Sequence, residues 1–330
     1  MLINLAKKIV ISRTDSIGDV ALTLPLVGIL KEIYPEANII FLGNTYTKPI
    51  IDCVANIDEV WSWAEISKME DRAQLEWLKS QNIDVFIHIF PRREIARLVR
   101  KAQIPERIGT SHRLFHLMTC NHRVNFTRKN SDLHEAQLNT KLLQPLGCRH
   151  HYSLSELADY INFSKVQPLA KDLKSHLSKT KKNIVLHPKS KGSALEWGVQ
   201  NFIALACSLP KTDYQFFFTG TEEESTFFRS QLPKQNNITD LSGKMSLDQL
   251  ISFIANSDLL VASSTGPLHI GGICHIHSIG LFTMRRPLHS GRWQPLGKSV
   301  HIINEACESE RNQLLKIEVE TVASKITEVL

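Results

Sequence analysis

A strand, a tight turn and a helix start follow one another in residues 258–272, DLLVASSTGPLHIGG. Residues 259–262 form a short apolar run of the kind found in parallel strands that are covered on both faces. Hydroxyl side chains come next, followed by Gly266 and Pro267, which suit a tight turn and a first helical turn. The free N–H groups of such a helix start would face the carboxyl edge of the sheet, where open α/β folds bind phosphates. An ordinary capped helix is the alternative interpretation.

The same alternation of apolar strands and amphipathic helices runs through both halves of the chain and predicts doubly wound parallel sheets. It stops between residues 150 and 181, and 330 residues exceed the usual size of one core, so we expect two domains, 1–160 and 161–330. A ligand is expected in the cleft between two such halves. The expected strands are 8–12, 37–42, 57–61, 83–88, 183–187, 214–219, 259–262, 278–282 and 300–303, and the expected helices are 20–34, 69–80, 95–102, 133–146, 199–209, 222–232, 246–256 and 311–330.

Targeting signals and cysteine pairs are both missing from the sequence. No apolar run is long enough to cross a bilayer, and the first residues lead directly into a strand, so we expect neither a signal peptide nor an anchor. The six cysteines are scattered without a Cys-x-x-Cys pair, which predicts buried thiols in a reducing cytosol rather than disulfides or a metal site. The expected location is therefore cytoplasmic.

Positive charge is concentrated in residues 92–129, which carry ten Lys or Arg against two Glu, a net charge of +8. The whole chain carries +6, so the remainder carries −2. Such a segment favours an anionic partner, such as a phosphorylated glycolipid, a membrane face or a nucleic acid, although a solvated helix face gives the same pattern. Nucleic acid is disfavoured because only Phe115 and Phe126 interleave the cations.

The loop at residues 13–19 places Asp19 after a glycine, at the carboxyl end of the first strand and at the start of a helix. A carboxylate there is either a helix N-cap or a general base directed toward a ligand. Ser16 could also cap the helix, which would free Asp19 for chemistry. A side chain turned away from the space between the domains, or tied up inside its own domain, would overturn this role and the function built on it.

Two loops of the second half suit a nucleotide. Residues 187–193, HPKSKGS, offer lysines, hydroxyls and a glycine for a diphosphate, but they are not a Walker loop. Residues 220–224, GTEEE, offer carboxylates for ribose hydroxyls, or for the dipole of a first helical turn. No Gly-x-Gly-x-x-Gly sequence follows a strand, which argues against a nicotinamide dehydrogenase.

A series of short motifs runs along the chain: Arg13, Gly18, Asp19, Pro25, residues 107–109 (RIG), His134, 146–147 (LG), 187–188 (HP), Trp197, 220–224 (GTEEE), 242–247 (SGKMSL), 264–269 (STGPLH) and 292–297 (RWQPLG). Each motif is modest, but their order and spacing over residues 10–300 are specific. Together they resemble glycosyltransferase family 9, the ADP-heptose:lipopolysaccharide heptosyltransferases.

The resemblance implies an α/β GT-B fold, with two facing Rossmann-like domains, the acceptor on the first and the nucleotide sugar on the second. It implies transfer of a heptose with inversion and without a metal or other cofactor, from an ADP-sugar to the lipopolysaccharide inner core, with peripheral attachment at the inner membrane. Asp19 is then the general base. The implied donor-binding residues are Lys189, Ser190, Lys191, Glu224, Met245, Ser264, Thr265, Gly266 and His269, and the implied acceptor-binding residues are Arg13, Arg92, Arg93 and Arg97.

Two departures from the family pattern lie in the donor loops. Leu195 stands where many members have a lysine, so the phosphate contact is expected from Lys189 or Lys191. Ser264 stands where an aspartate is common. Another nucleotide-sugar donor, a GT-B epimerase and a non-catalytic nucleotide-sugar-binding protein are the alternative functions.

Overall fold

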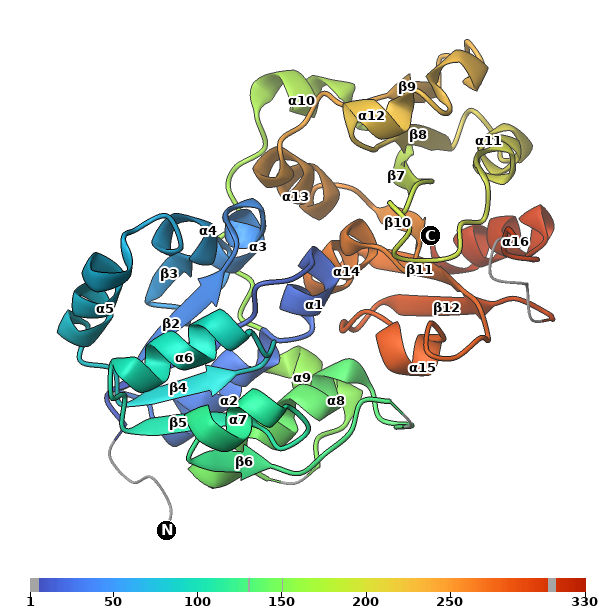
Figure 1. The fold of residues 1–330 in the computed structure, drawn as a ribbon. Helices are drawn as coiled ribbons and strands as arrows, with labels where there is room; N and C mark the ends of the chain where they lie inside the picture. Colours follow the sequence, from blue (N-terminus) through green and yellow to red (C-terminus); the bar gives the residue numbers. More distant parts are fainter. Residues whose placement is uncertain (1–5, 130, 150, 308–312) are drawn as a thin grey trace. The chain divides into compact units, whose positions relative to one another are not determined.

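The computed structural model describes residues 6–129, 131–149, 151–307 and 313–330, which divide into two compact units (Figure 1). The first unit is Met1–Lys165 and the second is Val166–Leu330. Residues 162–165 belong to the first unit because Phe163 forms an isolated bridge with Val54, and Lys165 N donates to Cys53 O over 2.9 Å. The division therefore lies a few residues after 160.

A six-stranded parallel sheet forms the centre of the first unit, in the order β3-β2-β1-β4-β5-β6. Its core is formed by strand side chains packed against the helices, for example Val10, Ile40 and Phe86 against Ile95 and Val99. The strands are β1 (Lys8–Ser12), β2 (Asn38–Gly43), β3 (Glu59–Ser62), β4 (Val85–His88), β5 (Glu106–Thr110) and β6 (His122–Val124). The helices are α1 (Ile17–Ala21), α2 (Pro25–Ile33), α3 (Lys48–Asp52), α4 (Trp63–Ile66), α5 (Asp71–Ser80), α6 (Arg93–Lys101), α7 (Leu114–Thr119), α8 (Glu135–Thr140) and α9 (Leu154–Asp159), with 3₁₀ turns η1 (Thr45–Thr47) and η2 (Lys141–Leu146).

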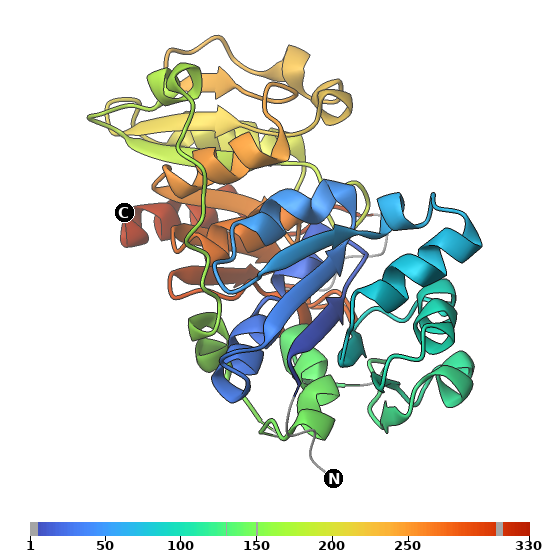
Figure 2. The same cartoon turned by 90° about the vertical axis from the view of Figure 1, so that its left-hand side faces the viewer.

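The second unit repeats this architecture with the order β12-β11-β10-β7-β8-β9, again all parallel. The central strands β8 (Tyr214–Phe218) and β10 (Leu259–Ser263) are almost entirely apolar, because both faces of the sheet are covered, and Phe216, Phe217 and Phe218 are all fully buried. Figure 2 gives a second view of this unit, in yellow-green to red. The strands are β7 (Lys182–His187), β8 (Tyr214–Phe218), β9 (Ile238–Asp240), β10 (Leu259–Ser263), β11 (His277–Phe282) and β12 (Val300–Asn304). The helices are α10 (Lys171–His176), α11 (Val199–Ser208), α12 (Glu222–Ser225), α13 (Leu247–Ala255), α14 (Gly266–Ile273), α15 (Ser290–Trp293) and α16 (Val319–Val329), with the 3₁₀ turn η3 (Arg229–Gln231).

Several expected helices are shorter in the structure. The helix expected over 20–34 is two helices, because Pro25 lacks the N–H that would continue α1 and instead starts α2. The helix expected over 133–146 becomes a 3₁₀ turn at Lys141, with Pro145 inside that turn and Gly147 ending it at φ 87°. The helix expected over 222–232 ends at Ser225, and the closing helix begins at Val319 rather than at 311, which lies outside the described residues.

The structure also bears on membrane-spanning helices, metal sites and disulfides. Within the described residues, no helix is long and apolar enough to cross a membrane, and no group of three His, Cys, Asp or Glu side chains is placed to hold a metal ion. All six cysteines are free thiols. The expectation that they are all buried is wrong, because Cys207 and Cys307 are exposed on the surface.

Candidate active site

The strand order reverses at one point in each sheet. In the first unit β1 lies between β2 and β4, and in the second unit β7 lies between β8 and β10. Within the first sheet the chain leaves β1 and β4 toward opposite sides, and within the second sheet it leaves β7 and β10 toward opposite sides. Doubly wound folds bind ligands at the carboxyl ends of such strands. The loops after β1, β4, β7 and β10, together with the helices that follow β1, β4 and β10, contain all of the expected site residues except Glu224 and Met245.

Arg13, directly after β1, is buried among side chains that accept its hydrogen bonds. Its Nε donates to Asp15 Oδ1 over 2.7 Å, and Nη2 donates to Asp19 Oδ1. On the other side, Nη1 donates to Glu135 Oε1 over 3.3 Å and to Asn139 Oδ1 over 3.4 Å. Only 3% of Arg13 is exposed. Through these hydrogen bonds its guanidinium joins the loop after β1 to helix α8 and holds Asp19.

Asp19 lies in the first turn of α1, and it does not cap that helix. Ser16 is the N-cap, and its hydroxyl also donates to Asp19 Oδ2 over 2.5 Å. Both carboxylate oxygens of Asp19 are therefore engaged inside the first unit, while 19% of the side chain stays exposed. By the expectation stated above, this engagement counts against Asp19 as a base. A carboxylate oxygen has a second lone-pair site, however, so Oδ2 can accept a proton beside the hydrogen bond from Ser16.

Asp15 is a second carboxylate at the same point. Burial raises the pKa of Asp15 to about 6, with the charge of Asp19 adding to the rise and Arg13 opposing it. For Arg13 itself, burial acts to lower the pKa, but Asp19, Asp15 and Glu135 together raise it. The cluster therefore contains one permanent cation and a carboxyl that titrates near neutral pH.

The expected acceptor arginines after β4 differ in their surroundings. Arg92 turns toward the loop after β1, where its Nε donates to Thr14 Oγ1 over 2.7 Å and its guanidinium lies 5.6 Å from the centre of the Phe90 ring. Arg93 and Arg97 lie four residues apart on the exposed face of α6. The structure thus separates one arginine that braces the loop from two that are open to solvent.

Helix α14 begins directly after β10 without a side-chain cap. Thr265 is at the N-cap position and makes no side-chain capping hydrogen bond. The hydroxyls of Ser263 and Thr265 are buried, and neither has a hydrogen-bond partner among the described residues. Ser264 and Gly266 flank Thr265, and His269 lies one turn into the helix. Free N–H groups and unpartnered hydroxyls at a helix start are the surroundings that an anion requires.

The loop after β7 is held by Glu196, a residue that the sequence analysis did not single out. Glu196 Oε2 pairs with Lys189 Nζ over 2.5 Å, and Oε1 accepts from Ser190 N over 2.9 Å. Lys191 is exposed and its φ is 48°. The expected lysines therefore differ: Lys189 is ion-paired, whereas Lys191 is open to solvent.

His187, the last residue of β7, is buried against Thr219, whose Oγ1 lies 3.1 Å from its Nδ1. Burial lowers the pKa of His187 to about 4, against a smaller opposing effect of the nearby Glu224 and Glu196 carboxylates. The imidazole is therefore neutral near pH 7, and it serves the packing of the sheet edge rather than as a cation.

The other two expected donor residues are Glu224, in α12, and Met245, in the loop before α13, and Arg229 joins these two segments. Glu224 Oε2 accepts from Thr221 N over 2.7 Å as part of a capping box, and Met245 precedes α13. Arg229 connects the two segments, because it donates to both Glu222 oxygens, over 2.6 and 2.8 Å, and to Ser242 O over 3.0 Å.

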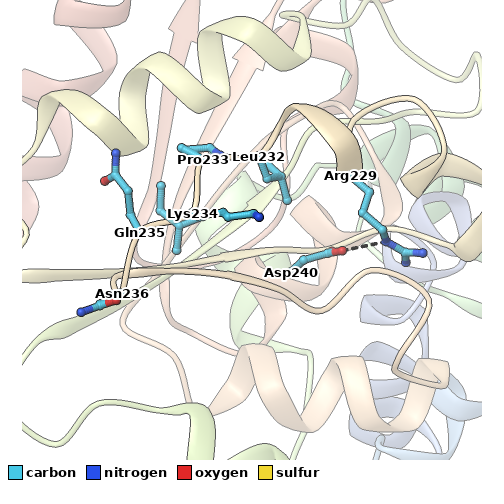
Figure 3. A pocket seen from close by; sticks show the side chains of 8 residues that line it. Arg229, Leu232, Pro233, Lys234, Gln235, Asn236 and Asp240 are labelled. Carbon is cyan, nitrogen blue, oxygen red and sulfur yellow. Dashed lines mark hydrogen bonds and ion pairs between the residues drawn. The ribbon is translucent and has the colours of Figure 1, made fainter.

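A shallow pocket of about 410 Å³ lies beside this arginine, at the outer edge of the second sheet (Figure 3). Arg229 Nε reaches Asp240 Oδ2 over 2.9 Å at one end of it. None of the expected site residues line this pocket, so we do not assign it to the reaction. Its lining residues are Arg229, Leu232, Pro233, Lys234, Gln235, Asn236, Ile238 and Asp240.

Comparison with known proteins identifies the family. The family model for glycosyltransferase family 9 (heptosyltransferase) matches residues 72–319, more than half of the chain. A putative glycosyltransferase of Haemophilus influenzae is 26% identical over 299 residues, which cover 88% of this chain and 86% of the relative. Lipopolysaccharide heptosyltransferase 3 of Escherichia coli is 24% identical over 280 residues, which cover 80% and 79%.

Among solved structures, the ADP-heptose lps heptosyltransferase II of Escherichia coli superposes with a TM-score of 0.74 at 18% identity, over 98% of each chain. This likeness, together with the two parallel six-stranded sheets, shows the GT-B fold. The chain belongs to glycosyltransferase family 9 (heptosyltransferase) and is a glycosyltransferase.

Proposed function

We propose that the chain transfers a heptose from ADP-heptose to the inner core of lipopolysaccharide, with inversion and without a metal ion. The observation that carries the donor side is the start of α14, where two buried hydroxyls have no partner among the described residues. The names of the Escherichia coli proteins, a lipopolysaccharide heptosyltransferase and an ADP-heptose heptosyltransferase, support the sugar, the nucleotide and the acceptor. In this proposal the first unit holds the acceptor and the second unit holds the nucleotide sugar.

Asp19 is the proposed general base. An acceptor hydroxyl attacks the anomeric carbon while the bond to the diphosphate breaks, and its proton passes to Asp19 Oδ2. That oxygen takes the proton at its second lone-pair site, beside the hydrogen bond from Ser16, while Arg13 keeps Oδ1 in place. Arg13 is therefore a positioning residue in this proposal, because its buried guanidinium faces carboxylates rather than the acceptor.

Charge on the departing ADP is stabilised by the chain itself. The N-terminal N–H groups of α14 and the hydroxyls of Ser263 and Thr265 receive the diphosphate, and a lysine of the loop after β7 adds a positive charge. Lys191 is the better candidate for that lysine, because Lys189 is already paired with Glu196. Turnover should fall more in Lys191→Ala than in Lys189→Ala, and full activity in both variants would discard this assignment.

Arg93 and Arg97 are the proposed contacts for phosphates or carboxylates of the inner core, at the face of the membrane. Both are exposed on α6, next to Arg92. Replacing Arg92, Arg93 and Arg97 with alanine should weaken acceptor binding and flatten its dependence on salt, since surface charges are screened. Unchanged kinetics on a lipopolysaccharide acceptor would contradict the assignment.

The test of the whole proposal compares ADP-heptose with UDP-hexoses as donors, using truncated lipopolysaccharide cores as acceptors. We expect transfer from ADP-heptose alone, a product of inverted anomeric configuration by NMR, and the same rate in excess chelator. Transfer from a UDP-hexose would point to another donor, and a chelator-sensitive rate would overturn metal independence. Donor binding without transfer to any core would favour the non-catalytic alternative.

A further inference from the structure

Helix α7 of the first unit turns its large apolar side chains outward. Leu114, Leu117 and Met118 are 83%, 49% and 66% exposed, while His116 and Thr119 are buried. The spacing of three and four residues places the three exposed side chains on one face of the helix. A surface helix normally buries its apolar face, so α7 is inverted relative to this rule. The described residues of its unit leave that face uncovered.

Packing fixes α7 in this orientation. The ring of His116 points into the unit, where its Nδ1 lies 3.0 Å from Thr110 O at the end of β5. The close approach depends on Gly109, because a Cβ there would lie 2.6 Å from His116 Nδ1 and 2.9 Å from Cys120 Sγ. The packing of His116 against Thr110 and Gly109 thus keeps the apolar face of α7 turned outward.

An arginine lies at each end of α7. Arg113 precedes the helix, and Arg123 reaches over its end, where Nη1 donates to Leu117 O over 3.2 Å. Both acidic residues of segment 92–129 pair outside this group, Glu94 with Arg92 and Glu106 with His122. Helix α6 packs against α7 and adds exposed cations. We call the whole the α7 surface, which comprises Leu114, Leu117 and Met118 with Arg100, Lys101, Arg113 and Arg123.

We propose that the α7 surface docks on a bilayer that contains anionic lipids. The three apolar side chains enter the headgroup region, and the cations lie against the negative headgroups. A helix of six residues is only about 9 Å long, so it lies in the interface and does not span the membrane. An excess of cations without acidic partners matches an anionic lipid surface, where each Lys or Arg adds to the attraction. This binding needs neither donor nor acceptor, so it stands apart from the transfer reaction.

The test is co-sedimentation of the full chain with vesicles of phosphatidylcholine alone or of phosphatidylcholine mixed with phosphatidylglycerol. The wild-type chain should bind the mixed vesicles and not the neutral ones. The variant Leu114→Ser/Leu117→Ser/Met118→Ser should bind at least about tenfold more weakly, because it loses the apolar contacts. Arg100→Gln/Lys101→Gln should also bind more weakly, and its remaining binding should depend less on salt.

Lys68→Gln/Met69→Ser is the matched control, since it removes one exposed cation and one exposed apolar side chain between α4 and α5 of the same unit. It should bind vesicles like the wild type. All variants should melt at the wild-type temperature, because the replaced side chains are exposed. Equal binding by the triple serine variant would overturn the proposal. The proposal would also be overturned if the wild-type chain were a dimer without lipid and the triple serine variant a monomer. The apolar face of α7 would then be covered by a second copy of the chain.

Discussion

The replacement Arg13→Met removes the guanidinium that three carboxylates share. The contacts that remain to each carboxylate set the loss in the free energy of unfolding. Glu135 keeps Arg128, whose Nε donates to Oε1 over 2.9 Å, and Asp19 keeps Ser16. Asp15 is the carboxylate that loses its main partner while it stays largely buried. Breaking a buried ion pair from one side costs about 3–5 kcal/mol, so we expect the lower end, about 3 kcal/mol, at pH 8.

Urea unfolding measures this loss, with Arg92→Met as the matched control. Arg92 donates to the neutral hydroxyl of Thr14, so its removal should cost only about 1 kcal/mol. The loss in Arg13→Met should shrink at pH 5, because Asp15, whose pKa is about 6 in the wild-type fold, is then protonated and needs no cation. A loss equal to that of Arg92→Met, or one that does not change with pH, would refute the reasoning.

Four further variants test single elements of the second unit. Thr265→Val removes a buried hydroxyl without a partner, so stability should be kept while calorimetry shows ADP binding about tenfold weaker; unchanged ADP affinity would contradict this. Gly243→Ala should cost about 2 kcal/mol in urea unfolding, because φ is 73° and the new Cβ would lie 2.0 Å from Glu222 Oε2, whereas Gly192→Ala, at φ 79° in open space, should cost only about 1. Burial lowers the pKa of His187 to about 4, so the neutral imidazole contributes to the stability of the fold above pH 6.5, and this contribution is lost as the pH falls toward 4. Between pH 7.5 and 5 the urea midpoint should therefore fall less in His187→Asn than in the wild type. Equal falls in the two proteins would count against the assignment.

Local patterns predicted nine of the twelve strands of the two sheets. The apolar runs predicted the central strands, and Pro25 marks the start of a helix that the predicted helix 20–34 had merged with its neighbour. Strands β5, β6 and β9 were missed, because residues 106–110, ERIGT, mix charge with a single large apolar residue, and β6 and β9 are only three residues long. The parallel order of the strands then determines which loops share a sheet edge, and this is why motifs far apart in the sequence lie at the two points of reversal.

The partners of the site residues were harder to predict. Glu135 lies 122 residues from Arg13, and nothing in the spacing of the chain signals that pair. Glu196, beside the loop that it holds, could have been noticed as a carboxylate next to the expected lysines. Helix α7 was not predicted at all, so its outward apolar face was missed with it.

The central claim is that the carboxylate of Asp19 takes the proton of the acceptor. Single-turnover transfer in Asp19→Asn, with ADP-heptose affinity measured in parallel, tests it most directly. The account predicts a rate lower by about 10²–10⁴, with donor affinity and stability kept, whereas Ser16→Ala should retain transfer because it frees Oδ2. Transfer by Asp19→Asn within a few fold of the wild-type rate would contradict the account.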